Sequence, residues 1–297
     1  MPRPLDADAL GGHCRPGSPA MCLRPRVQTN WLDDGMSELK KDADDHLLVG
    51  SVVKAFRVLE AFDRPHRSMG FSEISRVTGL EKSAAQRAAH TLWRLGYLDK
   101  APGSGEYRLS LRCQDIGMRF AEANRIVEMV APYITLLRRK TVASVNLTML
   151  DRTETVFVQR HTTVDMLGNK LGGRGRLPAY CTATGIAMLS QLPDAEVKAI
   201  LAESELKPHM PNTIWQVDDI LARIRKTREE RYAFGVEEDI ASDITLACGF
   251  TDPATGDVAA IGLSYFSGAT TPDEVQAQAR DLLISIVDNL ARELAGS

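Results

Sequence analysis

The segment from residue 51 to residue 109 constrains the fold most, because three helical patterns are followed there by a glycine-rich turn. The third pattern runs from about residue 82 to 95 and is closed by Gly96. The turn, Pro102-Gly103-Ser104-Gly105, lies between two short extended pieces and is a strong hairpin signal. Three helices followed by such a hairpin predict a winged helix-turn-helix.

Each helical pattern has its own apolar positions. In the first, which begins at Ser51, they recur at helical spacing at Val52, Phe56, Leu59 and Phe62. The second, over residues 71–79, turns Ile74 and Val77 inward and ends at Gly79. The third has an inward stripe made mostly of small residues, which are Ala85, Ala88, Ala89, Leu92 and Leu95.

The other face of the third helix is polar. Residues that can reach base edges or phosphates recur there at helical spacing, namely Lys82, Ser83, Gln86, Arg87, His90 and Arg94. Arginine pairs with guanine and glutamine with adenine, while serine and lysine suit phosphate oxygens. Because the N-terminal half of such a helix enters the major groove, we expect Lys82, Ser83, Gln86 and Arg87 to matter most. In the hairpin, Lys100 and Arg108 are expected to touch backbone phosphates.

Charge is unevenly distributed along the chain. The net charge is −3, yet residues 51–112 hold eleven Lys and Arg against six Asp and Glu, a local balance of +5. A basic block within an acidic chain is typical of a module that binds a polyanion. A chance fluctuation of the surface charge and an ordinary solvated helix face are the plain alternatives, but neither explains the helices, the hairpin and the charge together.

The regions on either side of this module differ in character. Residues 1–46 are rich in Pro, Gly and Asp, show no sustained period and are expected to form a disordered tail. Their composition leaves open whether translation starts at Met1 or Met36. We expect a DNA-binding domain over 48–110, a linker helix over 111–125 and a second domain over 126–297.

The second domain mixes helical and strand patterns. A helix is expected over 127–140, a hairpin over 145–160 and a glycine-rich loop over 168–175. Further helices are expected at 182–191, 194–202, 217–231 and 272–294, and further strands at 233–237, 245–251 and 258–266. Strands joined by short turns and flanked by helices predict an α+β fold.

The five cysteines (Cys14, Cys22, Cys113, Cys181 and Cys248) contain no C-x-x-C pair, which suits reduced thiols. The chain has no run of about 18 apolar residues and no apolar leader core. These observations predict a cytoplasmic protein that has no membrane partner.

Several motifs resemble the IclR-type transcription regulators. They are Ser51–Glu60, Ile74–Arg87, Leu92–Leu98, Leu177–Leu189, Cys248 and Ala259–Ser264, in this order. The resemblance covers nearly everything from residue 48 to 295. It implies a winged helix-turn-helix on double-stranded operator DNA, a GAF-like effector-binding domain, homodimers or tetramers, and control of a catabolic operon by a small, carboxylate-type metabolite. It implies no cofactor.

The resemblance also implies an effector site. Ala183 and Thr184 match backbone contacts, and the turn at 182–185 opens a helix whose free N–H groups could bind an anion. The other matching positions are Met166, Leu177, Glu238, Cys248, Gly262 and Ser264. At Gly262, where the family often has a hydroxyl residue, and at Ile186, where lysine is common, this chain differs.

Three other functions compete with this interpretation. Cys181 or Cys248 with His161 or His209 could form the thiol–imidazole pair of a hydrolase, but no glycine-framed nucleophile or paired acid–base motif accompanies them. The same residues could serve a metal-responsive sensor, although they lack close ligand spacing, and no bound metal is expected. The winged helix could also bind protein instead of DNA. We expect a regulator and no enzyme.

Overall fold

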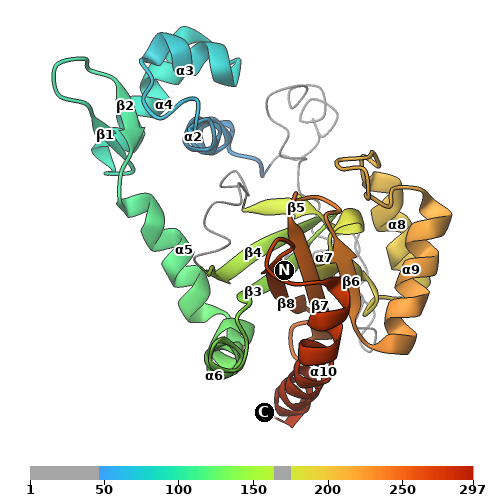
Figure 1. The fold of residues 1–297 in the computed structure, drawn as a ribbon. Coiled ribbons are helices and arrows are strands. Elements are labelled where there is room, and N and C mark those ends of the chain that lie inside the picture. The colour runs from blue at the N-terminus through green and yellow to red at the C-terminus, as the bar shows by residue number, and fades with distance from the viewer. Residues whose placement is uncertain (1–46, 164–174, 297) are drawn as a thin grey trace, which may run out of the picture. The chain divides into compact units, whose positions relative to one another are not determined.

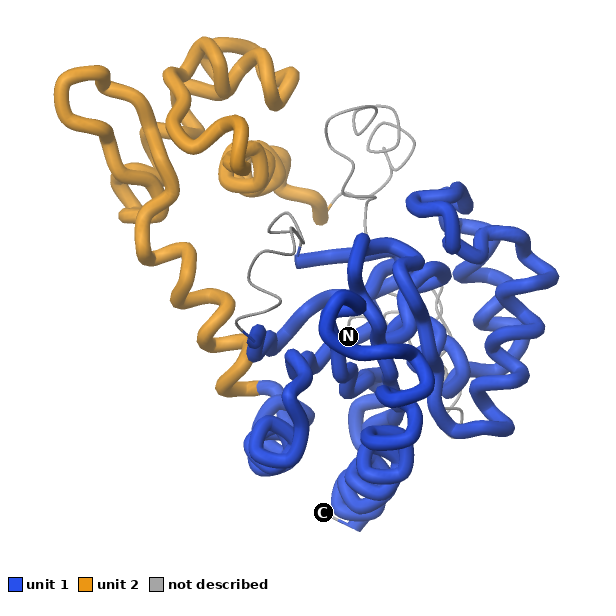
Figure 2. The backbone as a smooth tube through the Cα atoms, in the orientation of Figure 1, with its two compact units in different colours: residues 1–23, 124–297 blue, residues 24–123 orange. Residues whose placement is uncertain are grey.

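The computed structural model describes residues 47–163 and 175–296. They fall into two compact units, whose described parts are 47–123 for the first and 124–163 with 175–296 for the second (Figure 2). The expected tail at 1–46 and most of the glycine-rich loop, with Met166, lie outside the described residues.

The first unit is a winged helix-turn-helix, as the sequence predicts (Figure 1). Gly79 ends its second helix with a φ of 66°, a left-handed conformation that glycine adopts without strain. The elements are α2 (Gly50–Glu60), α3 (Phe71–Thr78), α4 (Lys82–Arg94), the antiparallel strands β1 (Leu98–Lys100) and β2 (Tyr107–Leu109), and α5 (Arg112–Ala123). The core of the unit consists of Val58, Met69, Ile74, Leu80, Ala85, Ala89, Leu92, Leu98 and Tyr107.

Part of the predicted apolar stripe proves to be exposed. Val52 and Phe56 on α2 are 51% and 53% exposed, whereas Val58 is fully buried. The apolar residues of α2 therefore lie on two faces, and only one of them meets the core. Leu95, also expected inside, is 52% exposed because it follows the last turn of α4 as its C-cap residue.

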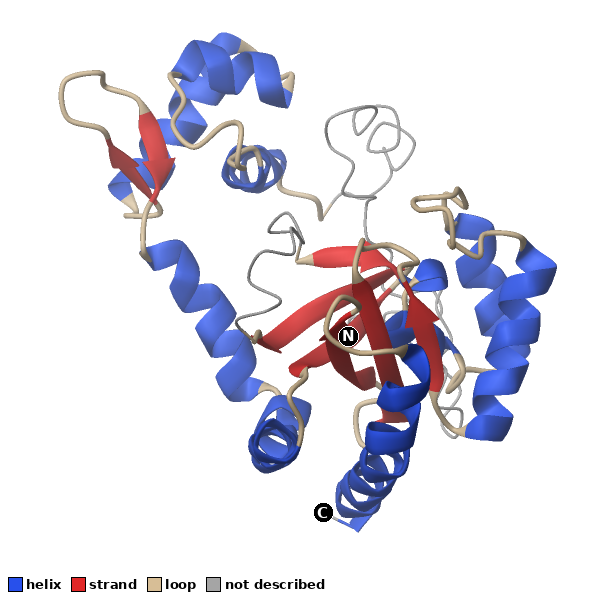
Figure 3. Cartoon of the chain, viewed as in Figure 1, coloured by secondary structure: helices blue, strands red, loops and turns tan. Residues whose placement is uncertain are grey.

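The second unit is an antiparallel sheet with helices on both faces (Figure 3). Its described strands are ordered β5-β4-β3-β8-β7-β6, and each neighbouring pair is antiparallel. They span β3 (Ser144–Asp151), β4 (Glu154–His161), β5 (Arg176–Pro178), β6 (Ala233–Val236), β7 (Asp243–Thr251) and β8 (Val258–Phe266). The helices are α6 (Arg125–Lys140), the short 3-10 turn η2 (Ala179–Cys181), α7 (Ala183–Leu189), α8 (Asp194–Glu203), α9 (Val217–Glu230) and α10 (Pro272–Gly296).

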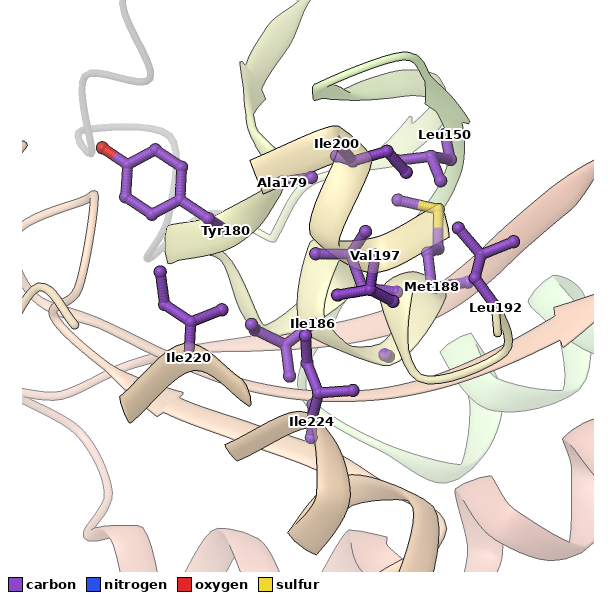
Figure 4. Close-up of a cluster of buried hydrophobic side chains, with 14 of the residues drawn as sticks. Leu150, Ala179, Tyr180, Ile186, Met188, Leu192, Val197, Ile200, Ile220 and Ile224 are labelled. Carbon is purple, nitrogen blue, oxygen red and sulfur yellow. The ribbon is translucent and has the colours of Figure 1, made fainter. Parts of the chain in front are cut away.

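The two faces of the sheet pack differently. On one face α7 lies so close that a Cβ at Gly249 of β7 would come within 2.1 Å of the Ala187 carbonyl oxygen. Apolar side chains of α7, α8 and α9 pack together above this face, among them Ile186, Val197 and Ile220 (Figure 4). Helices α6 and α10 contact the sheet through β3, β7 and β8. Because side chains alternate along a strand, small and polar residues lie under α7 and larger apolar residues face the other way.

The structure confirms the α+β class and the order of helices and strands, with end shifts of one to three residues. The short strand β5, which pairs with β4, was not predicted. No helix within 47–163 and 175–296 is both long and apolar enough to cross a membrane.

Candidate nucleic-acid interface and ligand cavity

Helix α4 presents a continuous polar face. The buried residues Ala85, Ala89 and Leu92 anchor its other side. All six residues predicted for the polar face are exposed, namely Lys82, Ser83, Gln86, Arg87, His90 and Arg94. No ion pair among the described residues engages Lys82, Arg87 or Arg94. The face therefore carries cationic and amide donors that are available to a partner.

The two wing residues differ in freedom. The Lys100 ammonium lies 4.3 Å from the centre of the Trp93 ring and 5.3 Å from that of Tyr107, which holds it against the base of the hairpin. The Arg108 side chain is 56% exposed, and its Nε lies 3.9 Å from an Asp99 carboxylate oxygen. An exposed pair at this distance is weak, so Arg108 can exchange Asp99 for another anion.

In the second unit a cavity with about 510 Å³ of empty space, part of it open to solvent, lies at the start of α7 against the sheet. The wall combines apolar, hydroxyl and acidic residues: Asn146, Phe157, Leu177, Cys181, Thr182, Ala183, Thr184, Gly235, Glu237, Glu238, Asp239, Ile240, Asp243, Thr245 and Ser264.

One end of this wall is a hydrogen-bonded row of four residues. The Asn146 amide donates to Ser264 Oγ at 3.3 Å, and Ser264 Oγ lies 2.7 Å from Thr245 Oγ1. Thr245 donates to an Asp243 carboxylate oxygen at 2.6 Å. Burial raises the pKa of Asp243 from 3.8 to about 6, although the hydroxyl donors oppose this shift.

The other acidic residues of the wall have nearby partners. Glu238 forms an ion pair with Arg223 at 2.7 Å, but burial still raises the pKa of its carboxyl. Glu237 accepts hydrogen bonds from the Ser242 N–H at 3.1 Å and the Ser267 hydroxyl at 2.9 Å. Fixed carboxylates of this kind shape a cavity without being free to move into it.

Cys181, His209 and Asp239 form a second cluster. Their sulfur, nitrogen and oxygen atoms lie within 4.8 Å of one another, a donor set that a transition metal could use. Burial raises the pKa of the Cys181 thiol strongly, and Asp239 and Glu238 add to this shift. The pKa of Cys248 is likewise raised by burial, to about 12. Neither thiol has the lowered pKa of a nucleophile, which argues against a cysteine hydrolase.

The structure brings together five of the predicted effector residues and separates one. Leu177, Ala183, Thr184, Glu238 and Ser264 all line the cavity. Gly262 lies just behind, since a Cβ there would come within 2.7 Å of the Thr184 methyl group. Met166 lies outside the described residues.

Cys248 is the residue that the structure separates from this cavity. It lines a different hollow, beside Arg231 of the chain after α9 and Asp288 of α10. In β7, Thr245 faces the cavity, and alternation therefore turns Cys248 to the opposite face of the sheet. The family motif located the strand correctly, but strand parity excludes Cys248 from this wall.

The expected anion-binding turn is partly satisfied by its own cap. The Thr182 hydroxyl accepts a hydrogen bond from the Gly185 N–H at 3.1 Å, as an N-cap residue does. Ala183 and Thr184 remain at the cavity wall.

Sequence reasoning named Ser264 but missed the other three residues of the polar row, Asn146, Asp243 and Thr245. Asn146 and Asp243 lie about a hundred residues apart and meet only because β3 and β7 both pair with β8. Arg160, opposite Asn146 in the β3–β4 pair, was also missed; its guanidinium lies 5.2 Å from the centre of the Phe157 ring. Buried strands with polar residues at alternate positions, as in Ser144-Val145-Asn146-Leu147-Thr148, were the available signal.

Two family models match this chain. The model described as IclR helix-turn-helix domain matches residues 51–102, and that described as Bacterial transcriptional regulator IclR C-terminal matches residues 118–292. The chain belongs to the IclR family of bacterial transcriptional regulators. Its polar α4 face is therefore the exposed face of the last helix in a family helix-turn-helix, and its cavity lies in the IclR C-terminal domain.

Relatives and solved structures agree with this assignment. The Pca regulon regulatory protein of Pseudomonas putida is 24% identical over 249 residues, 83% of this chain and 84% of the relative. The regulator XynR of Escherichia coli (strain K12) is 27% identical over 229 residues, 77% of this chain and 90% of the relative.

Among solved structures, an IclR homolog from Microbacterium hydrocarbonoxydans, complexed with 4-hydroxybenzoate, has a TM-score of 0.70 at 19% identity and covers 84% of this chain and all of that one. An IclR transcriptional regulator from Alicyclobacillus acidocaldarius has a TM-score of 0.72 at 20% identity and covers 82% and 98%. At these identities the structures establish the shared fold.

Proposed function

We propose that this IclR-family regulator reads double-stranded operator DNA with α4 and releases or tightens its hold when a small organic acid binds the cavity of the second unit. The main observation that supports DNA binding is the row of exposed polar residues from Lys82 to Arg94. Arg87 offers two donors to a guanine edge, and Gln86 offers one donor and one acceptor to an adenine edge. Lys82 and Ser83 suit phosphates at the helix start. Arg108 adds a phosphate contact from the wing, and Lys100 a weaker one.

DNA binding is tested by fluorescence anisotropy with the intergenic DNA beside the protein's own gene. We expect the logarithm of the binding constant to fall linearly with the logarithm of salt concentration, because each phosphate contact releases counterions. Binding that is absent or insensitive to salt would favour a protein partner for the winged helix.

Two features support an organic acid as the effector. Ala183 and Thr184 place the first turn of α7 at the cavity wall, where helix amides favour an anion. Arg160 makes no hydrogen bond within the described residues and lies on the Phe157 ring at the cavity edge, where its positive charge interacts with Asp243 and can also attract an anion. One solved relative is complexed with an organic acid, 4-hydroxybenzoate.

A cavity-filling variant tests the site. We expect 4-hydroxybenzoate or another small acid of a panel to raise the melting temperature of the natural protein, since a ligand of the folded state stabilises it. Thr184→Phe should abolish this shift by filling the cavity. Leu136→Phe, on an exposed face of α6, is the matched control and should leave the shift unchanged.

We also propose that the chain works as a homodimer in the cytoplasm, where its DNA lies. Helices α2 and α5 of the first unit each expose large apolar residues, and an exposed apolar patch can mark an association surface. They include Val52, Phe56, Ile116, Met118 and Phe120, each between 50% and 53% exposed. Light scattering on Phe56→Glu should show monomers if this surface holds the dimer, and an unchanged mass would remove α2 from it.

A further inference from the structure

The polar row at the base of the cavity has an unequal balance of donors and acceptors. We infer that this cavity selects an effector that carries a hydroxyl or amine donor, which Asn146 and Asp243 accept. This inference rests on the effector-binding function proposed above and names the chemical class of ligand for that same site.

The number of protons in the polar row determines which group donates and which accepts in each hydrogen bond. At about pH 7.5 the Asp243 carboxyl is ionised, because burial raises its pKa only to about 6, and a carboxylate can only accept. Thr245 therefore donates its single hydroxyl proton to Asp243 at 2.6 Å. The Ser264 hydroxyl, 2.7 Å from Thr245 Oγ1, donates its own proton to Thr245 or to Asp243. Both hydroxyls are then used up as donors.

These donor and acceptor roles also determine which way the Asn146 amide is oriented. Because Ser264 has no proton left, it must accept, and the group 3.3 Å away must be the Asn146 NH₂. The Asn146 oxygen then faces the other way. This oxygen is buried and has no hydrogen-bond partner among the described residues, and the whole side chain is only 3% exposed. A buried amide oxygen without a partner costs free energy unless a ligand or water supplies a donor.

The row leaves the Asn146 oxygen and part of the acceptor capacity of Asp243 without a partner, beside one remaining Asn146 N–H. Asn146 and Asp243 both belong to the cavity wall. A ligand that offers only another acceptor there is repelled by the Asn146 oxygen and the Asp243 carboxylate, and an apolar ligand leaves the Asn146 oxygen without a partner. A hydroxyl or an ammonium group satisfies them, and sites built around buried polar groups discriminate strongly against analogues that lack the matching group.

The ligand class follows from joining this donor subsite to the organic acid proposed above. The donor group of the acid meets Asn146 and Asp243. Hydroxy acids, amino acids and hydroxylated or aminated aromatic acids fit this description, whereas unsubstituted acids do not.

Matched acid pairs test the inference by isothermal titration calorimetry on the full chain at about pH 7.5. The probes are propionate with lactate and with alanine, and benzoate with 4-hydroxybenzoate and with 4-aminobenzoate. We expect at least one substituted acid to bind about tenfold or more tightly than its parent. Asp243→Asn, which turns an acceptor into a competing donor, should reduce this preference to about twofold or less, and Asn146→Leu should do the same.

A control variant separates this role from a general effect of buried amides. Gln159 also has a buried oxygen without a partner among the described residues, but it pairs with Leu147, which alternation turns to the opposite face from Asn146, and it does not line the cavity. Gln159→Leu should keep the full preference. Circular dichroism checks that each variant is folded.

Two failures are distinguishable. If the acids bind but parent and substituted acid bind equally, the donor subsite is wrong while the proposed effector site stands. If none of the six acids binds the natural protein, both the organic-acid effector and the donor subsite are overturned.

Discussion

The two functional regions of this regulator handle charge in opposite ways. Helix α4 displays its cations in solvent, all from one stretch of thirteen residues, with no strain and no buried charge. The cavity gathers Asn146, Asp243 and Ser264 from three strands and holds a carboxylate where burial raises its pKa. Residues of the DNA-reading face can therefore be substituted at little cost to stability. In the cavity, the buried polar groups that bind a ligand lower the stability of the ligand-free protein.

The largest effect should come from a buried ion pair in the second unit. Asp252 is fully buried, and its carboxylate lies 2.5 Å from the Arg125 guanidinium, which also donates to the Leu294 carbonyl oxygen at 2.8 Å. Asp252→Ala should lower the free energy of unfolding by about 3 kcal/mol, because it breaks a buried ion pair. Urea denaturation measures this. The control is Glu73→Ala, which breaks an exposed pair on α3 and should cost under about 0.5 kcal/mol.

The second largest effect should be a loss of DNA affinity when Arg87 on α4 is replaced. Arg87→Ala should weaken binding to the intergenic DNA by about 2 kcal/mol, or roughly thirtyfold, and relax the preference for one base. Its free energy of unfolding should stay within about 0.5 kcal/mol, since the side chain is exposed. Arg139→Ala removes the same charge from an exposed position on α6 and should leave DNA affinity nearly unchanged. Equal losses in the two variants would mean that α4 does not read bases.

Asp243→Asn should behave oppositely and stabilise the protein. Since burial raises the pKa from 3.8 to about 6, the folded chain holds this proton more tightly than the unfolded chain. Its contribution to stability is present below pH 3.8 and is lost as pH rises through about 6. The variant should therefore be more stable than the natural protein at about pH 7.5, by up to about 2 kcal/mol, with the advantage shrinking toward about pH 4. Thermal melts across this range measure it, and a pH-independent difference would mean that Asp243 is not the titrating group.

The smallest effect concerns Cys248. Because its side chain lies on the face away from the cavity, Cys248→Ala should leave acid binding unchanged and cost about 1 kcal/mol of stability through lost packing. Calorimetry with the tightest acid of the panel decides this. A large loss of affinity would restore Cys248 to the effector wall.

The same contrast explains what the sequence could predict. The α4 face is local, so spacing along one helix predicted which six side chains would be exposed. The cavity depends on strand register: Ser264 lies opposite Thr245, and Asn146 opposite Gly262, pairings that no local pattern contains. Cys248 was misplaced because a motif gives a position but not the face of the strand. Val52 and Phe56 were expected inside because an apolar stripe predicts burial without saying whether the chain itself or a partner covers it.

We propose that occupancy of the cavity changes the DNA affinity of α4, which links the two regions. The most direct test of this claim is the anisotropy of labelled intergenic DNA, titrated with the tightest-binding acid, for the natural protein and Thr184→Phe. We expect the acid to shift DNA affinity of the natural protein by about fivefold or more. Thr184→Phe should bind DNA as tightly as the natural protein and show no response. An acid response of equal size in the two proteins, or none in the natural protein, would contradict the claim.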